Sequence, residues 1–458
     1  MSLRVTSYGA ARTVTGSTHL IEMDRARILI DFGMFQGPDV EPLNYKPLEF
    51  DPRRLDAVLV THGHFDHIGR LPVLFQKGYR GKIYATRATK DVMRLILQNS
   101  ARIQKEDYER QRVRAGDDRK IPAPMYTEKD VYRTLDAVKI VRNYEPFSIR
   151  GIQVTFGHSG HIVGSSFIEL KGRTHCFLTS GDLGQSGPHV IPDPDMPRGR
   201  ADVVMVESTY GNKLHPPMSK AVTEVVNLVH ETMRKGGNLL IPTFALARTQ
   251  DVLHQLRLAY DQRRLPRKMK VFLDSPLAIK FTRLYRRHPE LLSAGVKRHV
   301  MRGQDPFSWE DVEYTLSSRD ATKIQRRRKG TIILAGSGMA TGGRILNHLK
   351  RHLERPECAV AFVGFQAEGT LGRQLVEGAK TVKIDDETFQ VRAKITKIDG
   401  FSVHADQKGI GRWVSATGKP EVLLVHGDDE APAAVQSALA QNHGLNATIS
   451  EPGVTYEF

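Results

Sequence analysis

Residues 57–67 read Ala-Val-Leu-Val-Thr-His-Gly-His-Phe-Asp-His. The apolar run at 57–60 predicts a buried strand, and three imidazoles and one carboxylate follow it within six positions. Imidazole and carboxylate are ligands for zinc and similar divalent ions, and a rigid strand end holds them in place. We therefore expect a metal platform rather than a histidine-rich surface turn, with two residues facing one ion and two facing a second: His62 with His64, and Asp66 with His67.

The composition is that of a globular protein of more than one domain. The chain has 458 residues, of which 40% are hydrophobic, and lengths of this order favour two or three domains. No apolar stretch approaches the roughly 20 residues that cross a bilayer, and the N-terminus shows no signal-peptide core. Only Cys176 and Cys358 are present, which excludes a disulfide framework and a cysteine zinc site. We expect a cytoplasmic protein with no membrane partner.

The positive charge is concentrated in the middle of the chain. The formal net charge is +16, and residues 209–390 hold 31 Lys and Arg against 18 Asp and Glu, a net of +13. Such a segment attracts polyanions through its electrostatic field. The alternative is that these residues are solvated helix faces of an ordinary basic protein.

Periodicity divides the chain into three parts and predicts an α/β fold. Residues 1–208 alternate strand-like runs with a long charged helix over about 89–114, which is typical of a layered β-sandwich faced by helices. Residues 209–390 alternate helices with strands and predict a doubly wound parallel sheet. Residues 391–458 return to short strands and bring two more histidines, His404 and His426, which suggests a return to the first domain.

Two other turns offer ligands for a dinuclear centre. His161 lies in a glycine-bracketed turn before a strand, and Asp182 follows a strand in Ser-Gly-Asp-Leu-Gly. Each could instead be ordinary turn chemistry. His158 is also bracketed by glycines, so the local sequence does not separate it from His161.

Taken together, these motifs resemble the metallo-β-lactamase superfamily. Further segments narrow the likeness to the β-CASP nucleases. They are Val-Glu-Ser-Thr-Tyr-Gly at 206–211, Ile-Pro-Thr-Phe-Ala-Leu-Ala-Arg-Thr-Gln at 241–250, Phe-Ser-Val-His-Ala-Asp at 401–406 and Leu-Val-His-Gly at 424–427. Within that family, the chain resembles the bacterial and archaeal homologues of the cleavage-and-polyadenylation endonuclease subunit.

The resemblance implies a fold and a ligand set. The fold would be an αββα sandwich with an inserted β-CASP domain, holding two Zn²⁺ ions, with Mn²⁺ as the alternative metal. Asp182 would bridge the ions, and Asp31 would accept an imidazole N–H from behind the ligands. The remaining ligands would be His62, His64 and His161 for one ion, and Asp66, His67 and His426 for the other.

The implied function is hydrolysis of single-stranded RNA by a hydroxide that two metal ions activate. His404 would be the general acid, with Glu207 orienting it, and Asp66 would align the hydroxide. One alternative is a small-molecule hydrolase of thioesters or lactams, which would need no basic insertion. Another is an inactive RNA-binding scaffold, which would lack ligands, whereas none is missing here.

A glycine-rich segment at 336–344 follows a predicted strand and opens a helix, where backbone N–H groups bind anions. We predict that Ser337, Gly338 and Arg344 contact an RNA phosphate there, assisted by Arg373. A turn needed only for tight packing, and a nucleotide site, are the alternatives. Because only 7% of residues are aromatic, binding should depend more on phosphate contacts than on base stacking. The sequence is also compatible with assembly into a homo-oligomer.

Overall fold

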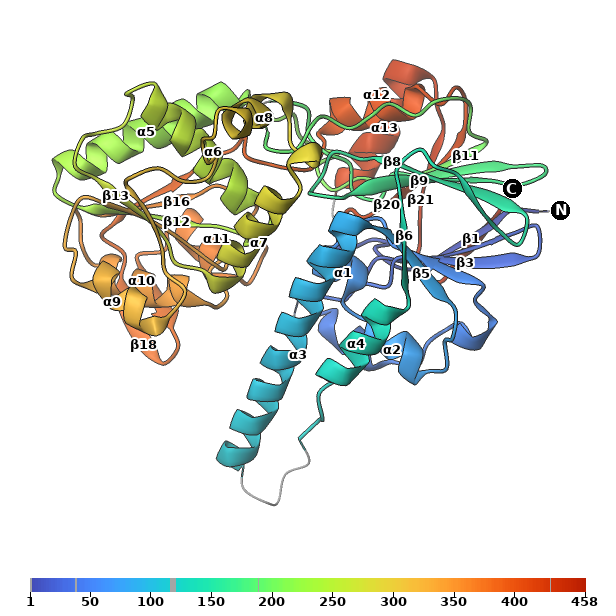
Figure 1. Ribbon diagram of the computed structural model, residues 1–458, viewed down its shortest axis with the longest axis horizontal. Helices are drawn as coiled ribbons and strands as arrows, with labels where there is room; N and C mark the ends of the chain where they lie inside the picture. The colour runs from blue at the N-terminus through green and yellow to red at the C-terminus, as the bar shows by residue number, and fades with distance from the viewer. Residues whose placement is uncertain (1, 38, 116–120, 188, 429) are drawn as a thin grey trace. The chain divides into compact units, whose positions relative to one another are not determined.

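Figure 1 traces the chain, of which the computed structural model describes residues 2–37, 39–115, 121–187, 189–428 and 430–458. The chain divides into two units, each with its own contacts. The sandwich unit comprises Met1–Ser186, Asp193–Leu214 and His404–Phe458. The inserted unit comprises Gly187–Pro192 and His215–Val403.

The first sheet of the sandwich unit contains the strand that the opening motif predicts. β4 is paired in parallel with β3 and β5, and all three of its residues are buried because both faces of the sheet are covered. The sheet order is β22-β1-β2-β3-β4-β5-β6. The strands are β1 (Arg4–Gly9), β2 (Thr18–Met23), β3 (Ala26–Ile30), β4 (Ala57–Leu59), β5 (Lys82–Thr86), β6 (Val138–Val141) and β22 (Thr455–Glu457).

The second sheet joins segments from both sides of the insertion. β11 pairs in parallel with β20, so the chain leaves and re-enters the same sheet. The order is β21-β20-β11-β10-β9-β8-β7. The strands are β7 (Phe147–Ile149), β8 (Ile152–His158), β9 (Ser166–Lys171), β10 (Cys176–Thr179), β11 (Val203–Glu207), β20 (Glu421–Val425) and β21 (Ala447–Ile449).

Three apolar cores hold the sandwich unit in four layers. A core between the sheets includes Ile28, Phe156 and Met205, and a second buries the first sheet against its helices. The third packs the second sheet on α12 and α13 through residues such as Trp413. The helices are η1 (Glu41–Tyr45), η2 (Pro52–Arg54), α1 (Phe65–Ile68), α2 (Leu71–Gln76), α3 (Arg87–Ala115), α4 (Glu128–Asp136), α12 (Gln407–Ser415) and α13 (Ala431–His443).

Local sequence explains where several of these helices begin and end. Thr127 and Asp130 form a reciprocal capping box at the start of α4, and Asp406 caps α12 by accepting from the N–H of Gly409. α13 ends at His443, and its C-cap residue Gly444 has a φ of 62°, which is left-handed and suits glycine.

The inserted unit is built on a six-stranded sheet in which every pair is parallel. The order is β14-β13-β15-β12-β16-β19, so the chain starts near the middle and winds outward in both directions. A separate hairpin pairs β17 with β18. The strands are β12 (Asn238–Pro242), β13 (Lys270–Leu273), β14 (Val312–Tyr314), β15 (Thr331–Ala335), β16 (Ala359–Phe362), β17 (Thr381–Ile384), β18 (Glu387–Gln390) and β19 (Lys394–Lys397).

Helices cover both faces of this sheet. Figure 1 shows α5 and α6 on one face and α9 and α10 on the other. The helices are α5 (Met218–Arg234), α6 (Arg248–Asp261), α7 (Pro276–Arg287), η3 (Pro289–Leu291), α8 (Ala294–Met301), α9 (Ser318–Gln325), α10 (Arg344–His352) and α11 (Leu371–Val376). The prediction of an αββα sandwich with an inserted doubly wound α/β domain is confirmed.

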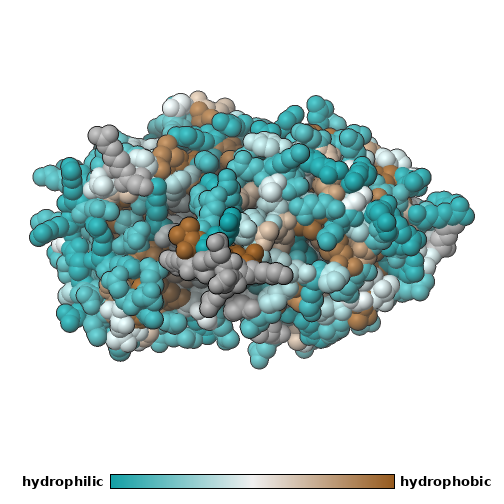
Figure 2. Space-filling model, turned by 90° about the horizontal axis from the view of Figure 1, so that it is seen from below, coloured by the Kyte–Doolittle hydropathy of each residue, from teal (hydrophilic) through white to brown (hydrophobic). Residues whose placement is uncertain are grey.

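The surface is predominantly polar on the face drawn in Figure 2, where hydrophobic residues form only small groups. Within the described residues, no helix combines the length and apolarity needed to traverse a bilayer.

Candidate metal centre

The topology gathers the predicted ligands at one edge of the sandwich. β3 and β4 run parallel in one sheet, and β10, β11 and β20 run parallel in the other. Polar side chains stand at or just beyond the carboxyl ends of these strands. They are Asp31 after β3, His62 after β4, Asp182 after β10, Glu207 at the end of β11 and His426 after β20.

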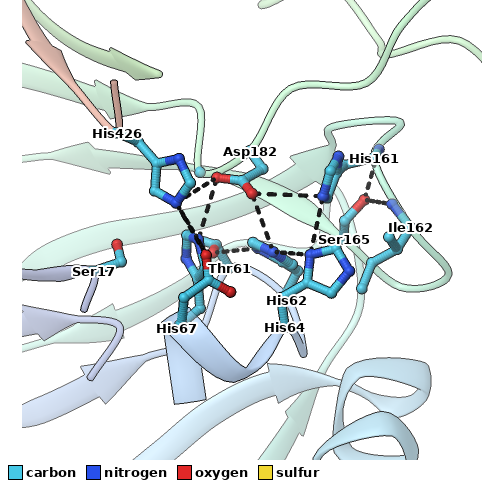
Figure 3. Close-up of polar contacts among 12 residues, drawn as sticks. Ser17, Thr61, His62, His64, His67, His161, Ile162, Ser165, Asp182 and His426 are labelled. Carbon is cyan, nitrogen blue, oxygen red and sulfur yellow. Dashed lines mark hydrogen bonds and ion pairs between the residues drawn. The ribbon is translucent and has the colours of Figure 1, made fainter. Parts of the chain in front are cut away.

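His62, His64 and His161 form the first set of ligand atoms, together with one oxygen of Asp182 (Figure 3). The Nδ1 atom of His64 lies 3.1 Å from the Nε2 atoms of both His62 and His161. Asp182 Oδ2 lies 3.4 Å from His62 Nε2 and 3.5 Å from His161 Nε2. Four potential donors therefore face a common point.

Asp66, His67 and His426 form the second set. The Nε2 atoms of His67 and His426 are 3.2 Å apart, and His426 Nε2 lies 3.3 Å from Asp66 Oδ2. The other oxygen of Asp182, Oδ1, lies 3.2 Å from His67 Nε2 and 3.7 Å from His426 Nε2. The two oxygens of Asp182 thus face different sets.

These separations fit divalent metal ions. Four ligands about 2.0–2.1 Å from a zinc ion at tetrahedral corners lie about 3.3–3.4 Å from one another, close to the spacing of the first set. Both oxygens of Asp182 are buried and accept no hydrogen bond from the described residues, although imidazole nitrogens surround them. A buried carboxylate without donors is costly, and cations on either side would satisfy it.

Hydrogen bonds behind the ligands fix which nitrogen of each ring is available. His67 Nδ1 lies 2.7 Å from Asp31 Oδ2, so this N–H donates to the carboxylate and Nε2 is left for the centre. Thr61 Oγ1 also donates to Asp31, at 2.7 Å, and lies 3.1 Å from His62 Nδ1. The Thr61 hydroxyl can therefore accept from His62, which again leaves Nε2 free for a metal.

Thr209 plays the same part for His426. Its hydroxyl donates to the backbone carbonyl of His426 at 2.9 Å and lies 3.1 Å from the Nδ1 atom of that ring. The hydroxyl oxygen can accept the Nδ1–H, and Nε2 then points into the second set. His426 has a φ of 51°, so the backbone that presents this ring is in the left-handed region.

Burial sets the protonation of the first set. Burial lowers the pKa of His62 well below its ordinary value and lowers that of His64 to about 4, so both rings are neutral at neutral pH and could serve as metal ligands. Burial alone would raise the pKa of Asp182, but the surrounding imidazoles, His426 first, hold it well below its usual range. The carboxylate is therefore ionised.

His404 and Glu207 form a pair beside Asp182. Glu207 is fully buried, accepts from the N–H of Leu183 at 2.5 Å and lies 3.0 Å from His404 Nδ1 through Oε2. His404 Nδ1 is also 3.9 Å from Asp182 Oδ2. Burial lowers the pKa of His404, yet the charge and hydrogen bond of Glu207 outweigh it and raise the pKa above its ordinary value.

His161 rather than His158 lies in the ligand sets. His161 follows β8 in a turn where Ser165 Oγ accepts from its backbone N–H at 3.0 Å. His158 is the last residue of β8, and among the described residues it belongs to none of the clusters that could hold a metal.

The residues predicted to bind RNA phosphate lie in the inserted unit, where both arginines have partners. Arg344 donates to Asp274 Oδ1 at 2.6 Å and to the carbonyls of Thr315 and Leu316. Arg373 pairs with Glu377 at 2.5 Å. Ser337 and Gly338 follow β15, and Ser337 Oγ accepts from the N–H of Thr341 at 2.9 Å. Phosphate contact by these residues stays a prediction.

Sequence reasoning missed the threonines that orient the ligands. Thr61 stands directly before His62 and Thr209 directly after Ser208, so both lie within motifs noted above. Their roles depend on distant partners, because Thr61 donates to Asp31, 30 residues earlier, and Thr209 acts on a histidine 217 residues away.

Three domain families match the chain. The metallo-beta-lactamase superfamily matches residues 11–208, the Beta-Casp domain matches residues 249–375, and the Zn-dependent metallo-hydrolase RNA specificity domain matches residues 388–450. The last match contains His404 and His426.

Relatives align along almost the whole chain. Ribonuclease TTHA0252 of Thermus thermophilus is 39% identical over 443 residues, which is 96% of each chain. The transcription termination factor FttA of Methanosarcina mazei is 32% identical across 94% of this chain and 67% of its own. Endoribonuclease ysh1 of Schizosaccharomyces pombe is 27% identical across 96% of this chain and 56% of its own.

A solved structure of a protein of unknown function from Enterococcus faecalis shares the fold. It covers the whole chain with a TM-score of 0.57 and 11% identity, which speaks for the fold alone. The family matches and the Thermus relative also show the family of the chain. The chain belongs to the metallo-β-lactamase superfamily and, within it, to the β-CASP family of metal-dependent RNA nucleases.

Proposed function

We propose that the protein is a zinc-dependent ribonuclease that hydrolyses phosphodiester bonds of single-stranded RNA. The observation that carries the proposal is the buried Asp182 carboxylate, whose oxygens face two separate sets of ligand atoms next to the His404–Glu207 pair. The names of the relatives in Thermus and Schizosaccharomyces support RNA as the substrate.

Two metal ions fit the ligand sets. His62, His64 and His161 would hold one, Asp66, His67 and His426 the other, and Asp182 would contact both. When bound, such ions supply a hydroxide nucleophile at neutral pH and neutralise charge on the phosphate. The preference for zinc rests on the donor set, since five imidazoles with carboxylates suit zinc better than magnesium.

His404 is the proposed general acid. Its Nδ1 is bound to Glu207, and the carboxylate both orients the ring and favours the protonated form. The opposite nitrogen, Nε2, can then deliver a proton to the leaving oxygen of the RNA chain. Asp66, whose side chain is 19% exposed, would align the attacking group.

Charge and family support RNA over a small-molecule substrate. The excess of +13 over residues 209–390 suits a polyanion, and a thioester or lactam gives no reason for it. The match of residues 388–450 to an RNA specificity domain points the same way. An inactive scaffold is disfavoured because all seven predicted ligands are present.

The test is to incubate the purified chain with single-stranded RNA, single-stranded DNA and a thioester, each with and without a chelator. We expect cleavage of RNA that the chelator abolishes and added Zn²⁺ restores. His404→Gln should lower kcat by roughly 10²–10⁴ while the bound metal stays unchanged, because the ring lies outside the two main sets. Thioester turnover with intact RNA would overturn the proposal.

A matched control distinguishes loss of the acid from loss of the fold. His158→Gln changes a histidine at the end of β8 that lies outside the metal clusters found in the described chain. This variant should keep its kcat. If His404→Gln cleaved RNA as fast as His158→Gln, the role of His404 would be wrong even if the nuclease activity stood.

A further inference from the structure

The inserted unit contains a pocket of about 180 Å³ that is walled by arginines. We call it the arginine pocket. The lining residues that matter are Arg327, Arg328, Arg351, Arg355, His348 and His352. None of them belongs to the proposed catalytic apparatus.

Helical spacing explains why these residues meet. His348, Arg351 and His352 lie three and four residues apart and so share one face of α10, with Arg355 following the end of the helix. Arg327 and Arg328 come from the loop between α9 and β15. Two stretches of chain therefore contribute guanidinium groups to one hollow.

The histidines form a satisfied floor. His352 Nδ1 lies 2.7 Å from the carbonyl of His348, and its Nε2 lies 3.1 Å from the side-chain amide of Asn238. Burial lowers the pKa of His352 to about 4, so this ring is neutral. His348 is bound to Asp274 at 2.7 Å. The four arginines carry the permanent positive charge of the pocket.

The guanidinium charges are only partly balanced. Arg355 donates to Glu357 at 2.8 Å and to the carbonyl of Arg328 at 2.7 Å, which holds it in place. No hydrogen bond or ion pair joins Arg328 or Arg351 to any side chain in the described parts of the protein. Arg327, Arg328 and Arg351 are exposed, so water and salt screen part of their mutual repulsion, and an anion bound between them would lower it further.

Helix dipoles offer a simpler explanation for some of these residues, because cations near a helix C-terminus are favourable. That explanation fits Arg351 in the last turn of α10. It does not account for Arg328, which follows the helix end and its C-cap residue Arg326, since the effect of the dipole fades within the last turn.

We propose that the arginine pocket binds a phosphate group. Guanidinium groups match phosphate oxygens in geometry and charge. The volume is below the roughly 300–1,000 Å³ of pockets that enclose whole small molecules, so it suits a phosphate or diphosphate whose remaining atoms lie outside. If the proposed function holds, the source of the phosphate is the RNA substrate, which would then be held at a second point in the inserted unit.

The test compares two double variants of the full-length protein. Arg328→Gln with Arg351→Gln removes two charges from the pocket, and Arg283→Gln with Arg287→Gln removes two exposed charges from α7 as a matched control. With a chelator present to prevent cleavage, the pocket variant should bind single-stranded RNA roughly tenfold more weakly at low salt, and its log–log salt slope should fall by about 1. The control should change affinity by less than about threefold.

A second readout locates the anion. Pyrophosphate should slow hydrogen exchange over residues 324–328 and 348–355 in the wild-type protein but not in the pocket variant. Protection without any change in RNA affinity would support the phosphate site and assign it to a small phosphate compound. If pyrophosphate protects these residues in a protein that cleaves no RNA, the phosphate site is supported and the proposed ribonuclease function is wrong. Equal RNA affinities of the two variants, with no protection by pyrophosphate, would overturn the inference.

Discussion

In both units, a buried aspartate stands just beyond the carboxyl end of a strand and faces histidine side chains. In the inserted unit, Asp274 follows β13 and binds Arg344 and Thr315 at 2.6 Å and His348 at 2.7 Å. In the sandwich unit, Asp182 follows β10, yet its buried oxygens accept no hydrogen bond from the described residues. The first network supplies its own cation and donors, whereas the second would be completed by metal ions from outside.

The difference shows that a histidine–carboxylate cluster at a strand end does not by itself define a metal site. The hydrogen-bond partners of the carboxylate separate the two cases. An arginine and a hydroxyl donate to Asp274, whereas imidazoles with available nitrogens surround Asp182. Both aspartates are about equally buried, at 2% and 1% exposure, so burial alone would not separate them.

Replacing Asp182 should have the largest effect. Asp182→Asn removes the carboxylate charge that both ligand sets share, and we expect RNA cleavage to fall by roughly 10⁴, with fewer bound metal ions per chain. Elemental analysis of the purified variant and single-turnover cleavage measure the two effects. A variant with two metal ions and full activity would contradict the bridging role.

Replacing Asp274 should destabilise the protein without touching the metal. Asp274→Asn leaves Arg344 and His348 without their carboxylate, and breaking a buried pair of this kind costs about 3–5 kcal/mol. Arg344 is 24% exposed, so solvent screens part of this cost and a value of about 3 kcal/mol is expected. Chemical denaturation measures the loss, and metal content should equal that of the wild type.

Replacing Asp31 tests whether the hydrogen bond to His67 contributes to metal affinity. Asp31→Asn weakens the hydrogen bond that orients His67, and we expect metal affinity to fall by about 10–100-fold. Competition with a chromogenic chelator measures the change. Restoration of cleavage by excess Zn²⁺ would separate this supporting role from that of Asp182, where added metal should not restore the rate.

Lowering the pH should reduce the difference in unfolding free energy between the wild type and Asp274→Asn. Burial would raise the pKa of Asp274, but hydrogen bonds from His348, Thr315 and Arg344 more than offset it and leave the pKa below its ordinary value. The stabilisation is therefore present above about pH 4 and disappears as the pH falls through the lower pKa of the folded state. The unfolding free energies of the two proteins, measured by chemical denaturation, should converge at low pH. A difference that grew in acid would contradict a lowered pKa of Asp274 in the folded state.

Much of this architecture could be predicted from sequence, because the decisive signals are local. The strand and loop at 57–67 hold four potential ligands in sequence, and alternating helices and strands mark the insertion. The choice between His158 and His161 depended on family resemblance, since the two have similar neighbours. The structure separates them by placing one in a strand and the other in a turn that faces the centre.

The remaining features depend on long-range contacts that no local pattern encodes. Arg344 was predicted to bind phosphate because it opens a helix, but its partner Asp274 lies 70 residues earlier. The basic run at 326–329 was visible in the sequence, whereas its meeting with Arg351 and Arg355 required the packing of α9, α10 and their loops.

The pairing of β11 with β20 also has a consequence for synthesis. Ser208 and Val425 are neighbours through a hydrogen bond although 217 residues separate them, so this sheet cannot close until the whole insertion has been translated. The inserted unit has its own core, and domains generally fold as units during synthesis, so this unit can fold before the second sheet of the sandwich unit closes. His426 is the last of the seven predicted ligands to be synthesised, so a nascent chain would acquire the proposed hydrolytic activity only after the whole insertion and β20 have been translated.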